Sequence, residues 1–140
     1  MSKLLLDTNV LIYSIDEGSK YFKQANKIFT KQFELYTTSK NLSEFLSVIT
    51  RIPKNPMSLK DALLVVKDFS DALTVIYPDE DSFKIFINLL KQYQPVGLHI
   101  HDYEIISIAL SNKIKTIATF NEKDFEKVND IELFTFNNEI

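Results

Sequence analysis

Short apolar runs alternate with longer amphipathic segments along most of the chain. A short apolar run is typical of a buried strand, whereas apolar residues at i, i+3, i+4 and i+7 indicate one buried face of a helix. Strands are therefore predicted at Lys3–Asp7, Leu35–Thr38, Thr74–Tyr77 and Thr116–Thr119, with a final short strand near Ile131–Phe136. This alternation implies a three-layer α/β/α fold, in which helices cover both faces of a mainly parallel sheet of four to five strands.

Helices are expected between these strands, and polar residues mark where several of them begin. The apolar stripes are Tyr21, Phe22, Ala25 and Phe29; Leu42, Phe45, Leu46 and Ile49; Leu59, Ala62, Leu63 and Val66; and Phe83, Phe86, Ile87 and Leu90. Ser19 is the predicted N-cap of the first helix, and Ser58 with Asp61 resembles a capping box for the third. The acidic run from Asp79 begins the fourth, where the helix dipole favours negative charge. A last helix is expected from about Asp102 to Asn112.

Composition sets the organisation and the setting. The chain has 140 residues, of which 45% are hydrophobic, so residues 1–140 are predicted to form one domain with an apolar core. The absence of cysteine excludes disulfides and thiolate zinc sites, and it points to a reducing, cytoplasmic location with oxygen ligands for any metal. The N-terminal apolar run is too short for a signal peptide, and no segment resembles a membrane span.

The formal net charge of -3 argues against broad electrostatic capture of nucleic acid. Four lysines recur at helical spacing opposite an apolar stripe: Lys20, Lys23, Lys27 and Lys31. Such a row is typical of a solvated face, and it would also suit phosphates or an acidic partner segment. Arg51, on the same side of its helix as Glu44, is the better candidate for contacting a substrate phosphate.

Acidic residues lie where a parallel sheet would bind a ligand, beyond the carboxyl ends of its strands. Asp7 ends the first predicted strand, Glu44 lies on the helix after the second, and residues 120–124 follow the fourth. Asp7 would also serve as the N-cap of a helix beginning at Asn9. By periodicity alone Glu44 faces away from the apolar stripe of its helix, which predicts an ordinary solvated side chain.

Asp102 is the most informative acid by its position on a helix. Its direction coincides with the apolar arc of the last helix, so it should point inward, where a carboxylate needs a cap, a cation or a metal. Glu104 projects to the opposite face and is predicted to be solvated. His99 and His101 would suit a zinc site only with help from carboxylates, and packing or hydrogen bonding is favoured for them, with His101 orienting Asp102.

Four segments carry a resemblance: LLLDTNVLIY around Asp7, NLSEFLSVITR around Glu44, HDYEIISIAL around Asp102, and TIATFNEKDF with Asn121 and Asp124. In this order and spacing they resemble the PIN-domain family, and the short single-domain form is similar to the VapC-type toxins of toxin–antitoxin pairs. The last segment departs from the family pattern, because Asn121 stands where an acid is frequent and Asp124 follows three residues later.

The resemblance implies an endoribonuclease that uses Mg²⁺ or Mn²⁺, bound by Asp7, Glu44, Asp102 and a fourth ligand, to hydrolyse RNA phosphodiester bonds. Asp124 is favoured over Asn121 for the fourth position because of its charge. Arg51 and Thr8 are expected beside the substrate, while Asn9, Thr119 and Asn121, together with Thr8, hydrogen-bond and orient the ligands. A homodimer and a cognate antitoxin protein that covers the site are also implied.

Other functions stay open at this point. A catalytically silent PIN-like module that binds RNA or protein is the main alternative, and Asn121 is the feature that favours it. A phosphotransfer enzyme or receiver domain would use Asp7 as a nucleophile and usually a strand-end lysine, which the predicted strands lack. A dinucleotide-binding fold is disfavoured because Gly18 and Gly97 are the only glycines.

Overall fold

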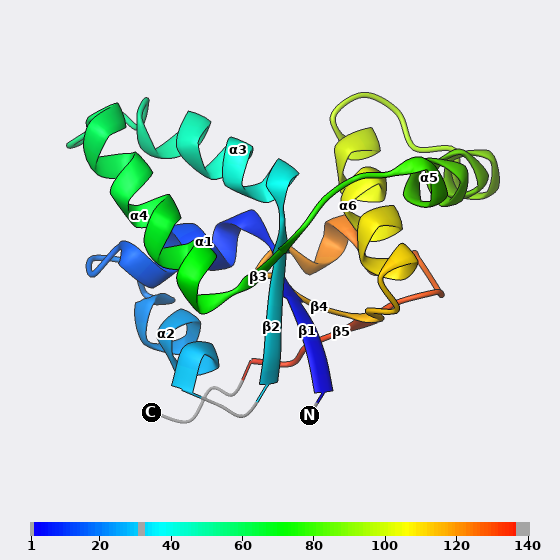
Figure 1. The fold of residues 1–140 in the computed structure, drawn as a ribbon, viewed down its shortest axis with the longest axis horizontal. Helices are drawn as coiled ribbons and strands as arrows, with labels where there is room; N and C mark the ends of the chain where they lie inside the picture. The colour runs from blue at the N-terminus through cyan, green and yellow to red at the C-terminus, as the bar shows by residue number, and fades with distance from the viewer. Residues whose placement is uncertain (1, 31–32, 137–140) are drawn as a thin grey trace.

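The computed structural model describes residues 2–30 and 33–136, which form a five-stranded sheet between two layers of helices (Figure 1). The strands are β1 (Ser2–Leu6), β2 (Phe33–Thr38), β3 (Thr74–Ile76), β4 (Thr116–Ala118) and β5 (Glu132–Leu133). Their order is β3-β2-β1-β4-β5, and every neighbouring pair is parallel. The predicted α/β class is therefore confirmed, with a last strand shorter than expected.

The helices divide between the two faces of the sheet. They are α1 (Thr8–Ile15), α2 (Phe22–Thr30), α3 (Ser39–Ile49), α4 (Leu59–Ala72), α5 (Glu80–Tyr93), α6 (His99–Ser111) and the short 3-10 helix η1 (Glu122–Asp124). Figure 1 shows α1 to α4 on one side and α5 and α6 on the other. No helix within the described ranges is long and apolar enough to cross a bilayer.

Two apolar cores hold the layers together, and β1 contributes to both because its side chains alternate between faces. Leu4 and Leu6 pack into the core shared with α1 to α4, while Leu5 packs into the core shared with α5 and α6. All three leucines are almost completely buried. Because Leu4 to Leu6 are buried on both faces of the sheet, this part of the strand is a continuous apolar run.

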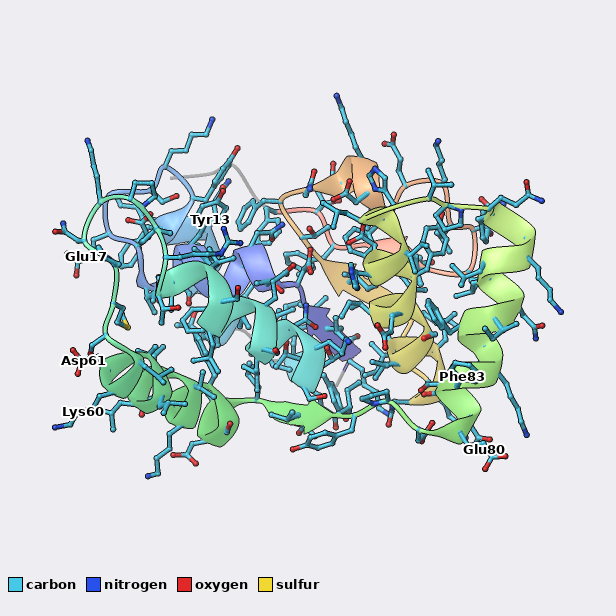
Figure 2. The ribbon with its side chains drawn as sticks, turned by 90° about the horizontal axis from the view of Figure 1, so that it is seen from above. Tyr13, Glu17, Lys60, Asp61, Glu80 and Phe83 are labelled. Carbon is cyan, nitrogen blue, oxygen red and sulfur yellow. The ribbon has the colours of Figure 1, made fainter. Side chains whose placement is uncertain are left out.

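The strand order creates a switch point between β1 and β4. The chain moves from β1 outward through β2 to β3, and then returns to the other side of β1 as β4. Strand connections therefore diverge beyond the carboxyl ends of β1 and β4, which is where α/β sheets bind ligands. Seen from above in Figure 2, this end of the sheet lies between the two layers of helices.

Three predicted helix starts differ from the structure. Helix α6 begins at His99, three residues before the predicted start, because Gly97 turns the chain with a φ of 63° just before it. Helix α1 begins directly after Asp7, one residue earlier than expected. Ser19 is not adjacent to α2, which begins at Phe22, although its Oγ accepts a hydrogen bond from the Tyr21 amide at 3.0 Å.

Candidate metal centre

Asp7 lies at the junction of β1 and α1 and is fixed through both of its oxygens. Oδ1 accepts hydrogen bonds from the Thr8 amide at 2.9 Å and from Asn41 Nδ2 at 3.2 Å. Oδ2 accepts one from the Thr119 hydroxyl at 2.8 Å. Asp7 is thus the N-cap of α1, as considered from the sequence, and it also faces a pocket. Capping and a functional role are compatible for this residue.

Thr119, directly after β4, connects Asp7 to the neighbouring loop. Its Oγ1 accepts hydrogen bonds from Asn9 Nδ2 and from the Asn121 amide, each at 3.0 Å. Since two donors already point at this oxygen, its own proton is directed at Asp7. The Asn9 side chain in turn accepts a hydrogen bond from the Phe120 amide at 3.1 Å. These contacts fix the carboxyl ends of β1 and β4 relative to each other.

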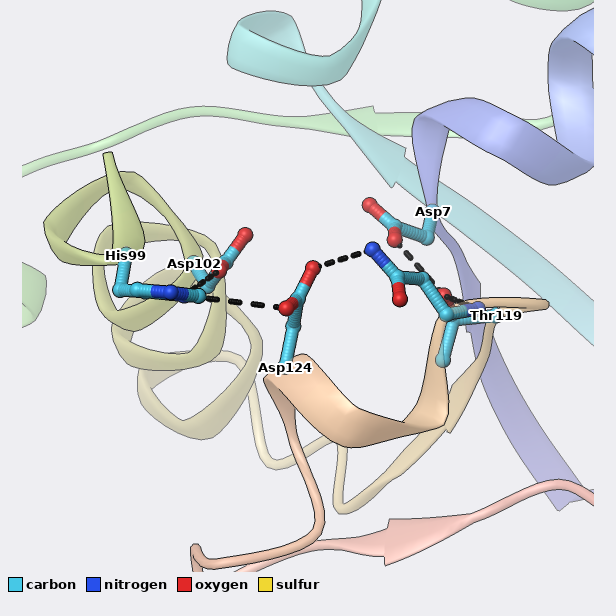
Figure 3. Close-up of polar contacts among 6 residues, drawn as sticks. Asp7, His99, Asp102, Thr119 and Asp124 are labelled. Atoms are coloured by element: carbon cyan, nitrogen blue, oxygen red, sulfur yellow. Dashed lines mark hydrogen bonds and ion pairs between the residues drawn. The ribbon is translucent and has the colours of Figure 1, made fainter.

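Asp102 and Asp124 approach Asp7 from the other side of the switch point. Figure 3 shows their carboxylates and that of Asp7 directed toward a common space. His99 Nδ1 lies 3.6 Å from Asp102 Oδ2 and 3.7 Å from Asp124 Oδ1. Asn121 Nδ2 donates a short hydrogen bond to Asp124 Oδ2. One ligand atom each from His99, Asp102 and Asp124 lie within 4.8 Å of one another.

Two acids of this cluster, Asp7 and Asp102, have a raised pKa. Burial is the largest cause of the raised pKa of Asp7, about 6, and the negative charges of Glu44 and Asp124 add to it. Burial also raises the pKa of Asp102 to about 7, with further increases from Asp124 and Asp7 and a partial decrease from His99. The surrounding protein therefore supplies too little positive charge to offset the burial and mutual repulsion of these carboxylates.

A pocket of about 350 Å³ opens over Asp7 and Asp102. Glu44 and Arg51 line it from α3 and the residues just after that helix, and both side chains are exposed. Glu44 is thus solvated, as its helical position predicted, and it also faces the acids. The pocket thus combines the carboxylates of these acids with the guanidinium of Arg51, which has no ion-pair partner within residues 2–30 and 33–136.

Several sequence expectations need correction. Thr8 is only 4% exposed, and its hydroxyl accepts a hydrogen bond from Asn41 Nδ2 at 2.9 Å, so direct contact with a substrate does not fit its burial. His99, not His101, contacts Asp102. Glu104 is partly buried and pairs with Lys40 at 3.3 Å, instead of being freely solvated.

The predicted lysine row is only partly a helical feature. Lys20 precedes α2 and lies over the Tyr21 ring, with its Nζ 5.0 Å from the ring centroid. Lys23 and Lys27 lie on exposed positions of α2, and Lys31 lies outside the described residues.

Asn41 is the residue of the centre that the sequence arguments missed. It is 1% exposed and lies in the first turn of α3, where its Oδ1 accepts a hydrogen bond from the Thr38 hydroxyl at 2.7 Å. Thr38 and Asn41 form a reciprocal capping box, so the Thr-x-x-Asn spacing was the available signal. The cap uses Oδ1 of the Asn41 side chain, so Nδ2 is available to donate a hydrogen bond to Asp7.

Clustered acids at the switch point of a parallel sheet define a class of α/β proteins with an acidic centre beyond the strand ends. Within that class, residues 4–131 match the PIN domain. The chain belongs to the PIN-domain family. No curated protein sequence matches it significantly.

Solved structures with the same fold include chains of toxin–antitoxin complexes. A chain of VapBC2 from Rickettsia felis, bound to a promoter DNA fragment, is 19% identical with a TM-score of 0.71, covering 96% of this chain and 98% of that one. DNA-bound VapBC from Salmonella typhimurium gives 23% identity, a TM-score of 0.69 and the same coverage. VapC20 from Mycobacterium tuberculosis, described as a toxin that cleaves the sarcin–ricin loop, gives 12% identity, a TM-score of 0.71 and coverage of 89% and 95%.

Proposed function

We propose that this protein is a metal-dependent endoribonuclease that acts as the toxin of a toxin–antitoxin pair. The observation that carries the proposal is the convergence of Asp7, Asp102 and Asp124 at the switch point, with the pKa of Asp7 raised to about 6 and that of Asp102 to about 7. In a PIN-domain chain, clustered carboxylates whose ionisation is disfavoured without a cation support a cation site.

The residues present fit Mg²⁺ or Mn²⁺. The donors are carboxylate oxygens, which hard divalent cations prefer, and His99 adds one imidazole that Mn²⁺ accepts more readily than Mg²⁺. Asn9 Nδ2 lies 3.5 Å from Asp7 Oδ2, which is long for a hydrogen bond, so this oxygen keeps capacity for a cation. We assign Asp7, Asp102 and Asp124 as ligands, with Glu44 completing the set from α3.

Different side chains of this protein would have different roles in hydrolysis. A bound cation would neutralise the carboxylates and polarise the scissile phosphate. Thr119 and Asn41 hold the Asp7 carboxylate in one orientation, and Asn121 does the same for Asp124. Glu44 lies exposed on the pocket wall, so the carboxylate oxygen that does not bind the cation is free to accept a proton from an attacking water.

Arg51 is the proposed contact for a substrate phosphate. It lines the same pocket as Asp7 and Asp102, and its planar guanidinium suits a phosphodiester. A protein with a formal net charge of -3 needs such local positive charge to bind RNA.

An RNA substrate and the absence of cysteine support a cytoplasmic location.

A toxin role requires a partner that restrains the nuclease. The structures from Rickettsia felis and Salmonella typhimurium are toxin–antitoxin complexes bound to DNA, which supports a cognate antitoxin for this chain. We also propose a homodimer. Expression of the chain alone should arrest cell growth, and co-expression of the protein encoded beside its gene should restore it. Normal growth on expression alone would count against a toxin.

The nuclease activity is tested with purified protein, structured RNAs and Mn²⁺ or Mg²⁺. Cleavage should need the cation and should fall at least about 100-fold in Asp7→Asn and in Asp102→Asn, since each removes a charged ligand. Asp68→Asn with Asp71→Asn is the matched control, because both acids are exposed on α4. Cleavage that survives in folded Asp7→Asn, Asp102→Asn protein would overturn the proposed mechanism, and absent cleavage by the wild type would overturn the function.

A further inference from the structure

A second pocket, of about 250 Å³, adjoins the acid cluster and shares His99 and Asp124 with it. It lies between the end of α5, the first turns of α6 and the segment around η1. The function proposed above assigns no role to the other side chains that line it. These include two lysines, Lys123 and Lys127, and two tyrosines, Tyr93 and Tyr103.

The two lysines give this pocket a local positive charge. Both are exposed, and neither forms an ion pair within the part of the chain that the structure describes. By contrast, Lys40 in the pocket over Asp7 is paired with Glu104 at 3.3 Å. Unpaired cations at the border of an acidic cluster are suited to an anion that must approach it.

The two tyrosines form a rigid aromatic wall. The Tyr93 hydroxyl donates a hydrogen bond to Asp130 Oδ1 at 3.0 Å and accepts one from the Asn129 amide at 3.1 Å, which fixes its ring. The Tyr103 ring lies against it, with ring centroids 5.7 Å apart. Tyr103 is only 5% exposed as a residue, but its hydroxyl is open to solvent and has no hydrogen-bond partner among residues 2–30 and 33–136. An accessible hydroxyl of this kind is available to a ligand in the pocket.

We propose that this pocket binds the nucleotide next to the scissile phosphate of a single-stranded or looped RNA. Lys123 and Lys127 contact its phosphate, the tyrosine wall contacts its base, and the Tyr103 hydroxyl bonds to the base edge. A concave pocket admits an unpaired base, whereas a base within a duplex cannot enter it. This proposal rests on the ribonuclease function and adds a nucleotide subsite beside the acid cluster.

The test measures binding separately from cleavage. Fluorescence anisotropy of a labelled single-stranded RNA is recorded in EDTA, over a series of salt concentrations, with RNA integrity checked on gels. The double variant Lys123→Ala, Lys127→Ala should bind at least about 10-fold more weakly at low salt. Its slope of log affinity against log salt should fall by about 0.7, the value for one phosphate charge neutralised on a single strand.

The matched control is Lys60→Ala, Lys67→Ala, which removes the same charge from exposed positions on α4. Figure 2 shows Lys60 pointing away from the molecule at the end of that helix. The control should keep the wild-type slope. Tyr103→Phe, which keeps the buried ring, should weaken binding about 3-fold without changing the slope, because it removes one hydrogen bond.

Each outcome bears on a different proposal. Equal salt slopes for the two lysine double variants, in protein that cleaves RNA, would overturn the nucleotide pocket and leave the nuclease function intact. Binding that depends on Lys123 and Lys127, in wild-type protein that does not cleave with Mn²⁺, would support the pocket and contradict the nuclease function. Wild-type protein that does not bind RNA in EDTA, but cleaves it with Mn²⁺, would overturn the pocket alone.

Discussion

Asn41 Nδ2 lies 3.2 Å from Asp7 Oδ1 and 2.9 Å from the Thr8 hydroxyl, linking α3 to the end of β1. Asn41 is 34 residues from Asp7 in the chain, and it is almost completely buried. The oxygen of the same amide group caps α3 through Thr38. One side chain therefore fixes a helix start and the orientation of a proposed metal ligand.

Replacing Asn41 with alanine should impair both roles. We expect Asn41→Ala to lose about 1–3 kcal/mol of stability, because buried polar partners are left unpaired. Its Mn²⁺ affinity, measured by calorimetry, should fall about 10-fold or more. Asn26→Ala is the control, since Asn26 Nδ2 bonds to the carbonyls of Ser14 and Phe22. A similar loss of metal affinity in both variants would contradict a positioning role for Asn41.

Asn121 should orient Asp124 through the short hydrogen bond that it donates to Oδ2. Asn121→Ala is expected to weaken Mn²⁺ binding about 10-fold, because an unrestrained carboxylate is a poorer ligand. Asn112→Ala serves as the control, since Asn112 Nδ2 bonds to the Ile108 carbonyl at 2.8 Å near the end of α6. Unchanged Mn²⁺ affinity in Asn121→Ala would show that Asp124 does not depend on this contact.

His99 should influence which cation the centre prefers. His99→Ala is expected to reduce Co²⁺ affinity about 10-fold and Mg²⁺ affinity much less, because imidazole favours later transition metals. Co²⁺ binding is followed by absorption spectroscopy, and Mg²⁺ binding by competition. His101→Ala is the matched control, as His101 is exposed and forms no ion pair with a described residue. Equal effects on the Co²⁺ and Mg²⁺ affinities would show that His99 does not influence which cation the centre prefers.

Stability of the metal-free protein should fall as pH rises from about 5.5 to 8. The pKa of Asp7, about 6, and that of Asp102, about 7, exceed the values near 3.9 expected for unfolded Asp. The folded state therefore binds more protons than the unfolded state in this range, so deprotonation destabilises it. The loss from these two groups is complete once both are ionised, above about pH 8.

Thermal unfolding in EDTA measures how the stability of the metal-free protein depends on pH. The Tm of Asp102→Asn should depend less on pH than that of the wild type, because one raised pKa is removed. Mn²⁺ should raise the wild-type Tm more at pH 8 than at pH 5.5, since the cation binds ionised carboxylates. A wild-type Tm that rises with pH over this range would contradict the direction of the shifts.

Much of the fold was predictable because strand and helix periodicities differ so clearly in this chain. The three residues before Asp7, Leu4 to Leu6, are all apolar because this part of β1 is buried on both faces. The start of α6 was predicted wrongly because the turn at Gly97, with its φ of 63°, depends on backbone geometry and not on apolar spacing. Because α6 begins at His99, this histidine lies on the same helix as Asp102, three residues earlier, within reach of its carboxylate.

The sequence by itself determined the alternating elements, the parallel sheet and the order in which acids follow the strands, because these depend on local periodicity. It could not show that Asn41 contacts Asp7, that His99 bridges Asp102 and Asp124, or that Glu104 pairs with Lys40. Those relationships join side chains from different elements, and only the packing of helices around the switch point decides their distances. The raised pKa values of Asp7 and Asp102 have the same origin, since burial and neighbouring charge exist only in the folded chain.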